Sequence, residues 1–189
     1  MTDQLNLIRA GEVGGLPVVT IEGGEDAAEI KDVVYDGTHH HLIGFTLNRR
    51  GWFRGSMKAT LETASVVGIG PDAVMIADEA AMTDRGQTSE VLDSPGDAHV
   101  VIGNDVLTSS GTVLGTVVDV IIETGANPQA VGYEVETDDG SVFVPSSAQM
   151  ALSGTNLVVP AEAEEFTRND LVGFGASVSS FRQLLGDQS

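Results

Sequence analysis

A short stretch rich in cations and aromatic rings is the part of the sequence best suited to bind another molecule. Its basic and aromatic members are Arg49, Arg50, Trp52, Phe53, Arg54 and Lys58. No acidic residue interrupts the stretch, and Trp52 is the only tryptophan in the chain. Guanidinium groups bind carboxylates and phosphates through paired hydrogen bonds, and large aromatic rings add contact area at a small entropic cost. We therefore interpret the stretch as a candidate surface that binds a partner. The alternative is a self-neutralising loop that folds over the protein's own acidic surface, or in which Trp52 caps the barrel.

Three consecutive histidines, His39 to His41, follow Asp36 and raise the question of a metal site. Side chains alternate along a strand, so His39 and His41 could share one set of ligands whereas His40 could not. Zinc needs three or four ligands, and the remaining histidine, His99, is distant in sequence. We therefore predict no metal site and interpret the run as a polar strand end or hairpin flank, with a pH-sensitive contact as a further functional alternative.

Other catalytic patterns are missing. The glycine-rich segment 68–72 lacks the Lys-Ser/Thr pair of a phosphate-binding loop, and there is no Gly-x-Ser-x-Gly nucleophile motif. Cysteine is absent, which excludes disulfides, thiol catalysis and thiolate metal sites. We therefore expect no catalytic residue and no cofactor, and we predict that the protein is not an enzyme.

These residues are carried by an internal repeat, in which residues 14–78 align with residues 102–161. The four aligned blocks are Pro17–Thr20 with Asp105–Thr108, Ile30–Asp36 with Val117–Glu123, Leu42–Leu47 with Ala130–Val135, and Leu61–Ile76 with Val144–Val159. The first three blocks are rich in Val, Ile and aromatic residues, and Gly, Asp, Asn and Pro bound them, as is typical of strands. The fourth block shares hydropathy alone. The repeat predicts an all-β protein of two small tandem β-barrels.

Two features inside the repeat indicate local structure. Asp32 and Asp119 interrupt their apolar runs at equivalent positions, and their repetition favours a structural task such as bonding backbone groups. The segment 138–140, Asp-Asp-Gly, predicts a tight hairpin turn. In the first copy the same turn is enlarged to Asn48–Ser56, which contains most of the basic stretch.

The predicted boundaries are 1–78 for the first barrel, 79–98 for an acidic linker, 99–161 for the second barrel and 162–189 for a C-terminal helical extension. Within the extension, apolar residues at spacings of three and four form an amphipathic stripe: Leu171, Phe174, Val178, Phe181 and Leu185. Gly173 and Gly175 are expected to interrupt the helix, leaving Ser177–Leu185 as its firmer part. The stripe packs either on its own barrel or on a partner or second subunit.

The charge limits the classes of partner. Asp and Glu total 28 against 9 Lys and Arg, which gives a net charge of −19. Such a surface repels phosphate backbones and anionic membranes, so general nucleic-acid binding is disfavoured. The first residues have neither the basic nor the apolar region of a secretory signal, and no apolar run reaches the roughly eighteen residues of a membrane span. We therefore expect a cytoplasmic protein without membrane insertion.

The second copy carries a family resemblance. Gly111–Ile122 contains a Leu-Gly-x-Val-x-Asp strand, Val131–Tyr133 follows it, and Phe143–Pro145 ends in a Val-Pro step. In these features the chain resembles the PRC-barrel family, which includes the cytoplasmic domain of the photosynthetic reaction-centre H subunit and the C-terminal domain of a ribosome-maturation factor. In the first copy Glu62 replaces the proline, so that copy is the more divergent. The resemblance implies a compact β-barrel used as an adaptor in larger assemblies.

We therefore predict a non-enzymatic interaction module that docks on a protein partner or larger assembly, with self-association as a further expectation. One alternative is a small-ligand or metal-binding protein, which would be a possible enzyme, with a site between the barrels near the histidine run. The other is an RNA- or ribosome-associated assembly factor that uses the basic stretch, which the net charge of −19 disfavours.

Overall fold

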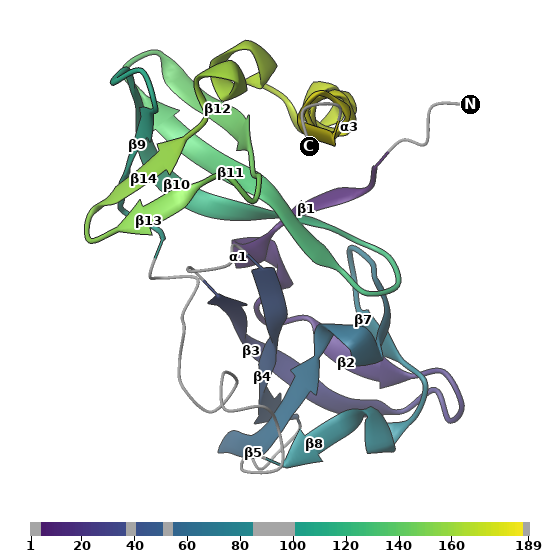
Figure 1. The fold of residues 1–189 in the computed structure, drawn as a ribbon. Coiled ribbons are helices and arrows are strands. Elements are labelled where there is room, and N and C mark those ends of the chain that lie inside the picture. Colours follow the sequence, from purple (N-terminus) through teal and green to yellow (C-terminus); the bar gives the residue numbers. More distant parts are fainter. Residues whose placement is uncertain (1–4, 37–40, 51–54, 85–100, 187–189) are drawn as a thin grey trace.

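The computed structural model describes residues 5–36, 41–50, 55–84 and 101–186. The chain folds mainly into strands, which form two seven-stranded sheets. Figure 1 shows the two sheets one above the other, each strongly curved into a small barrel, with a single long helix beside the upper one. The predicted all-β fold of two tandem barrels and a short C-terminal helical segment is confirmed.

The first barrel has the strand order β6-β7-β2-β3-β4-β5-β8. Strands β2 and β7 are parallel, and all other neighbours in this sheet are antiparallel. Its elements are β2 (Pro17–Thr20), β3 (Asp26–Asp36), β4 (His41–Arg49), β5 (Gly55–Glu62), the 3-10 helix η1 (Thr63–Ser65), β6 (Val66–Ile69), β7 (Val74–Ile76), the 3-10 helix η2 (Glu79–Ala81) and β8 (Met82–Asp84). Strand β8 and η2 fall in the stretch expected to be a linker, of which residues 85–98 lie outside the described residues.

The second barrel repeats this plan with the order β12-β11-β10-β9-β14-β13. Strands β14 and β9 form its parallel pair, which matches the pair of β7 and β2. Its elements are β9 (Asp105–Thr108), β10 (Val113–Glu123), β11 (Gln129–Thr137), β12 (Gly140–Pro145), β13 (Ala151–Ser153) and β14 (Asn156–Val159). The predicted tight hairpin joins β11 to β12, where Gly140 adopts a φ of +120° that disfavours other residues.

The register of the two barrels confirms the alignment made from the sequence. Val33 pairs with Phe45 in the first barrel, and the equivalent Val120 pairs with Tyr133 in the second. Strand β3 is irregular between Ile30 and Asp32 and again between Val34 and Tyr35. Strand β10 is irregular at the two equivalent places. The copies therefore share their β-bulges as well as their strand order, which ties Asp32 and Asp119 to the same local geometry.

One glycine is retained in both copies because two strands approach closely there. A Cβ atom added at Gly44 would lie 2.3 Å from the carbonyl oxygen of Leu61. A Cβ atom added at Gly132 would lie 2.4 Å from the carbonyl oxygen of the equivalent Val144. Real Cβ atoms do not approach a carbonyl oxygen so closely, so only glycine fits at either position.

Strand β1 (Leu7–Arg9) precedes the first barrel in the chain, but it belongs to the sheet of the second. It is antiparallel to the end of β10, with Leu7 opposite Glu123 and Arg9 opposite Ile121. The short helix α1 (Ala10–Val13) then leads into the first barrel, and both β1 and α1 lie between the barrels (Figure 1). The expected boundaries followed the repeat, which begins at residue 14 and so carries no information on β1.

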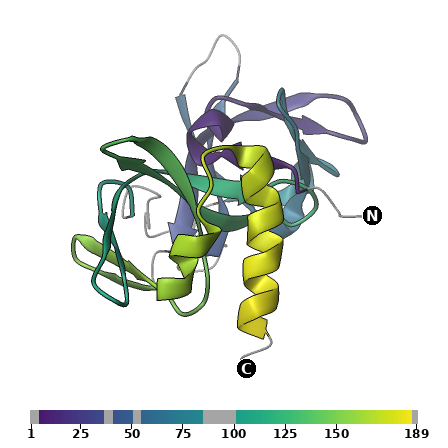
Figure 2. The same cartoon turned by 90° about the horizontal axis from the view of Figure 1, so that it is seen from above.

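The C-terminal segment packs on its own barrel, which is the first of the two alternatives left by the sequence. A 3-10 helix, η4 (Ala161–Phe166), precedes the long helix α3 (Leu171–Gly186). Phe174 and Val178 pack against three residues of the second barrel, Ile121, Val131 and Phe143. Figure 2 shows α3 lying along the second barrel.

The expected interruption at Gly173 and Gly175 does not occur, because α3 runs continuously through both glycines. The side chain of Asp170 accepts a hydrogen bond from the backbone N–H of Gly173 at 2.8 Å and so caps the helix. Gly175 is buried in α3, and a Cβ atom there would lie 3.5 Å from the Cβ of Leu5, which is an ordinary contact distance. Capping and burial offset the poor helix propensity of glycine here. No helix in the described ranges is long and apolar enough to cross a membrane.

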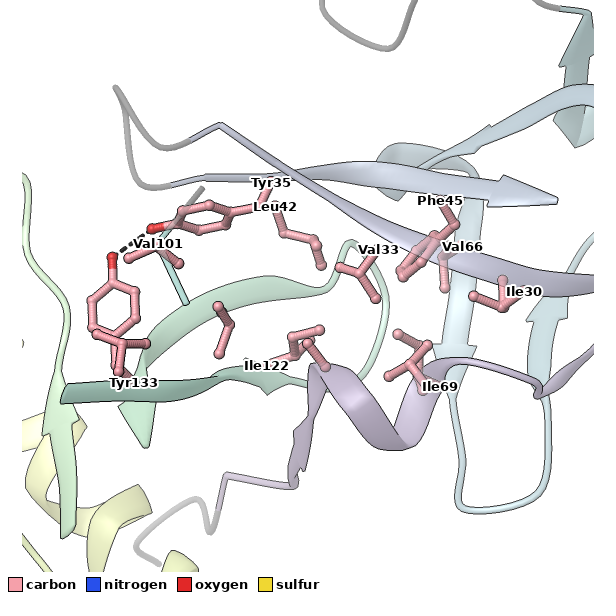
Figure 3. Close-up of a cluster of buried hydrophobic side chains, with 14 of the residues drawn as sticks. Ile30, Val33, Tyr35, Leu42, Phe45, Val66, Ile69, Val101, Ile122 and Tyr133 are labelled. Atoms are coloured by element: carbon pink, nitrogen blue, oxygen red, sulfur yellow. Dashed lines mark hydrogen bonds between the residues drawn. The ribbon is translucent and has the colours of Figure 1, made fainter. Parts of the chain in front are cut away.

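The two barrels share one hydrophobic core instead of packing as independent bodies. Val33 of the first barrel and Ile122 of the second belong to the same buried cluster, and so does Val101 before β9 (Figure 3). Tyr35 and Tyr133 are fully buried in this cluster, and their hydroxyl oxygens are 2.5 Å apart. The junction between the barrels therefore combines apolar burial with directional polar contacts, which also include the hydrogen bond from the backbone N–H of Asn127 to the carbonyl oxygen of Val66 at 3.3 Å.

Candidate functional site

The predicted binding stretch lies on the hairpin formed by β4 and β5. Arg49 pairs with Gly55 at the end of the ladder, and Lys58 lies further along β5. In Figure 1 β4 ends and β5 begins at the bottom of the first barrel, on the side that faces away from the second. Arg49, Arg50 and Lys58 are exposed, whereas Trp52, Phe53 and Arg54 lie outside the described residues.

The cations of this hairpin differ in their partners. Arg50 makes an ion pair with Asp26 at 3.2 Å, so part of the stretch does contact the protein's own acidic surface. Neither Arg49 nor Lys58 forms an ion pair with any residue that the structure describes. Among the described residues, these two cations therefore have no acidic partner. The assignment of the whole stretch as a binding surface stays a prediction.

The histidine run is described in part. His41 is the first residue of β4, where it is exposed and opposite Asp36. His39, His40 and His99 lie outside the described residues. Within the described ranges, no group of three or more His, Asp or Glu side chains comes together to hold a metal ion. The metal alternative stays a prediction that the placement of His41 does not support.

A cavity of about 280 Å³ opens between the barrels beside α1. Its walls include Asp32 and Lys31 of the first barrel, Asp119 of the second, and Gly11 of α1. Sequence reasoning singled out both aspartates as equivalent positions of the repeat, but it did not place them around one cavity. No signal in the sequence could have done so, because the repeat shows which residues are equivalent but not how the two barrels pack together.

Each aspartate of this cavity bonds nearby groups. Oδ1 of Asp119 accepts hydrogen bonds from the backbone N–H of Val120 at 2.8 Å and of Gly11 at 3.2 Å. Burial raises the pKa of the Asp119 carboxyl, while these backbone bonds act in the opposite direction. Oδ2 of Asp32 accepts from Nζ of Lys31 at 2.6 Å and from the hydroxyl of Thr46 at 3.2 Å. Asp119 therefore bonds backbone groups, as the repeat led us to expect, whereas these two contacts of Asp32 are with side chains.

Arg9 on β1 is a further anchor that the sequence did not reveal. Its Nε and Nη2 donate to the two carboxylate oxygens of Glu134, at 2.5 Å and 3.2 Å. The guanidinium group also lies 5.4 Å from the centre of the Phe143 ring. Since the residues before position 14 have no counterpart in the repeat, nothing in the sequence linked Arg9 to the second barrel.

The geometry described so far consists of two equivalent barrels fastened by buried contacts, with a basic hairpin at one end. Comparison with known families agrees with this arrangement. The model of the PRC-barrel domain family matches residues 5–81 and 97–165. The two matched ranges include every strand of both barrels apart from β8, and they end before α3. No curated protein matches the chain.

Proposed function

Because the chain belongs to the PRC-barrel family and carries two tandem copies of its domain, we propose that it is a non-enzymatic cytoplasmic adaptor. In this proposal the basic hairpin of the first barrel docks on a protein partner or a larger assembly. The second barrel, β1 and α3 hold the first barrel in a fixed orientation. The fold alone does not determine this function, so the proposal depends on the surface.

The observation that supports the proposal is the exposure of Arg49 and Lys58 without an ion-pair partner in the described part of the chain. In a protein with a net charge of −19, most cations are expected to be neutralised by neighbouring acids. An acidic face on a partner meets attraction at this hairpin and repulsion over most of the remaining surface. Complementary charge of this kind fixes orientation and accelerates association.

The test is co-purification from the native source with the hairpin altered. Changing Arg49, Arg50, Trp52 and Arg54 together to Ala should abolish recovery of a specific partner, since it removes both cations and aromatic area. The matched control is Arg182→Ala, which removes a cation from α3 that is paired with Glu123 at 3.1 Å. If the hairpin variant recovers the partner as well as the control does, the surface assignment is wrong.

The small-ligand or metal alternative has its own measurement. Metal analysis of the purified, untagged full chain reports directly on the histidine run, including the residues outside the described ranges. The adaptor proposal expects a substoichiometric metal content that does not change when His39 and His41 are replaced by Gln. A stoichiometric metal that disappears in this variant would replace the proposal with a metal-binding function.

A further inference from the structure

A second surface of different chemistry lies where the first barrel, the second barrel and α3 meet. It is a groove of about 780 Å³ with walls from β1, the turn between β6 and β7, and the beginning of α3. The groove exists only in the assembled molecule, because each wall comes from a different unit. Its apolar lining includes Leu5, Leu7, Ile8, Pro71, Leu171 and Val172.

Val172 is the most informative residue of this groove. Its exposed fraction of 69% is the highest among the large apolar residues that the structure describes as exposed. The opposite face of α3 packs on the second barrel through Phe174 and Val178. Valine is also a poor residue for an exposed helix position, because its branched Cβ loses rotamer freedom there. Neither packing nor helix stability therefore accounts for an apolar side chain at this position.

One acidic residue lines the groove, and two further exposed acids are next in sequence to lining residues. Glu12 lines it, Asp72 follows the lining residue Pro71, and Asp170 precedes the lining residue Leu171. All three carboxylates belong to exposed residues. The nearby cation, Arg9, lies 3.5 Å from Glu12 but is bound by both carboxylate oxygens of Glu134, so two acids share it. We call these three acids the rim of the groove, and they keep a negative charge beside its apolar floor.

We propose that this groove is the docking site for a segment of a second protein that has apolar side chains flanked by Lys or Arg. Apolar side chains would cover Val172 and the floor, and the flanking cations would meet Glu12, Asp72 and Asp170, as in an interface with an apolar centre and a polar rim. A second copy of this chain is disfavoured because each copy carries a net charge of −19. An anionic lipid surface is disfavoured for the same reason.

This inference goes beyond the adaptor proposed above, since it does not use the basic hairpin. The hairpin attracts acidic groups at one end of the first barrel, and the groove attracts basic, apolar segments at the junction with the second barrel. The two sites have opposite charge preferences, so a single partner segment does not suit both. A chain with both sites could hold two different proteins together.

The experiment uses the full chain and a displayed library of short random peptides. Peptides selected on the wild-type protein should combine an apolar centre with flanking Lys or Arg. Fluorescence anisotropy of the best synthetic peptide should then show weaker binding at high salt, because the rim charges are screened. Val172→Ser should weaken binding about five- to tenfold, as expected for one truncated apolar contact at an interface.

The matched control is Val113→Ser, because Val113 is 64% exposed but does not line the groove. It should leave the affinity unchanged. Amide signals of Gly70, Thr124 and Val172 in the ¹⁵N spectrum should shift on peptide addition, a readout that needs no variant. Reversing the charge of Arg49 and Lys58 should not change the affinity for the peptide. The groove proposal can therefore fail without the hairpin proposal failing, and the reverse.

Several results would overturn the proposal. The groove is not the site if the selected peptides are acidic, or if the shifted amide signals all lie outside the groove. It is also not the site if Val172→Ser and Val113→Ser change the affinity equally. Concentration-dependent dimerisation that Val172→Ser abolishes would make a second copy the occupant. Binding to phosphatidylcholine–phosphatidylserine vesicles that depends on Val172 would make it a lipid surface.

Discussion

The hydroxyl oxygens of Tyr35 and Tyr133 are 2.5 Å apart across the junction of the two barrels, and both side chains are fully buried in the core there. The rings are nearly perpendicular, with centres 6.5 Å apart. Tyr133 and Phe45 occupy equivalent positions in the repeat, as do Ile122 and Tyr35. Each tyrosine therefore occupies a position at which the other copy has an apolar side chain. The hydrogen-bonded pair is thus a feature of the junction between the barrels and not of the repeated barrel fold.

The first prediction concerns the coupling between these tyrosines. Tyr35→Phe should destabilise the protein by about 1–2 kcal/mol, because it leaves the buried hydroxyl of Tyr133 short of one partner. The double change with Tyr133→Phe should cost less than the sum of the single changes, because no hydroxyl is then left without the other. Urea unfolding of the four proteins measures the coupling, and strictly additive free energies would contradict the direct bond.

The second prediction uses the same pair as an optical probe. The chain has only two tyrosines, and burial raises the pKa of both hydroxyls. Above the ordinary tyrosine pKa of about 10, the unfolded chain loses phenol protons that the folded chain retains, so stability falls as the pH rises. Absorbance at the tyrosinate band should stay flat until the circular dichroism signal is lost. Tyrosinate formation before unfolding would show that the junction opens first.

The third prediction concerns the pH dependence contributed by Asp119. Since burial raises its folded pKa above the unfolded value, the folded state takes up a proton first as the pH falls. The stability of the wild type relative to Asp119→Asn should therefore rise as the pH is lowered from neutral toward that pKa. Asparagine retains one oxygen that accepts from the N–H groups of Gly11 and Val120. The repulsion among the other acids contributes equally to the stability of both proteins, so it cancels in the difference. A difference that is constant with pH would contradict the buried carboxyl.

The fourth prediction concerns the close strand contact in each copy. Gly44→Ala and Gly132→Ala should each destabilise the protein by about 3 kcal/mol or more, because the added Cβ meets a backbone carbonyl that cannot move freely. Gly68→Ala is the control, since a Cβ there meets nothing within 4 Å. Thermal unfolding should separate the two variants clearly from the control. Similar melting temperatures for all three would argue against the close approach.

The fifth prediction concerns the attachment of β1. Arg9→Met should lower the stability by about 2 kcal/mol, because it leaves Glu134 half-buried without its cation. Hydrogen exchange at Ile122, which is opposite Ile8 in the ladder, should accelerate as β1 detaches more often. Arg182→Met provides the comparison, since its more exposed ion pair with Glu123 should contribute little. Equal effects of the two changes would mean that Arg9 does not anchor the strand.

The sequence predicted the barrels well because each is encoded twice. Pairing Ile30–Asp36 with Val117–Glu123 identified equivalent strands, and the observed ladders follow that alignment residue by residue. The hairpin turn at Gly140 was predictable for a different reason, since its conformation depends on a few neighbouring residues. Local chemistry and internal repetition were sufficient for these features.

Features that depend on tertiary contacts were not predictable. The continuity of α3 through Gly173 and Gly175 goes with the burial of Phe174 and Val178 against the second barrel, a contact between distant parts of the chain. The cavity that joins Asp32 to Asp119 depends on how the barrels face each other, and a repeat defines equivalence without defining a docking angle. Arg9 was missed because its partner, Glu134, is 125 positions away, and neither residue belongs to a recognisable motif.

The placement of β1 also affects how the chain folds during synthesis. At about 5–20 residues per second, β1 leaves the ribosome roughly ten seconds before its partner strand β10 has been made. The first barrel can close in this interval, but β1 must stay unpaired until the second barrel emerges. Its short ladder then brings together parts of the chain that are far apart in sequence, which makes this contact costly in loop entropy. Strand β1 is therefore synthesised before the other described strands but is one of the last of them to reach its final position.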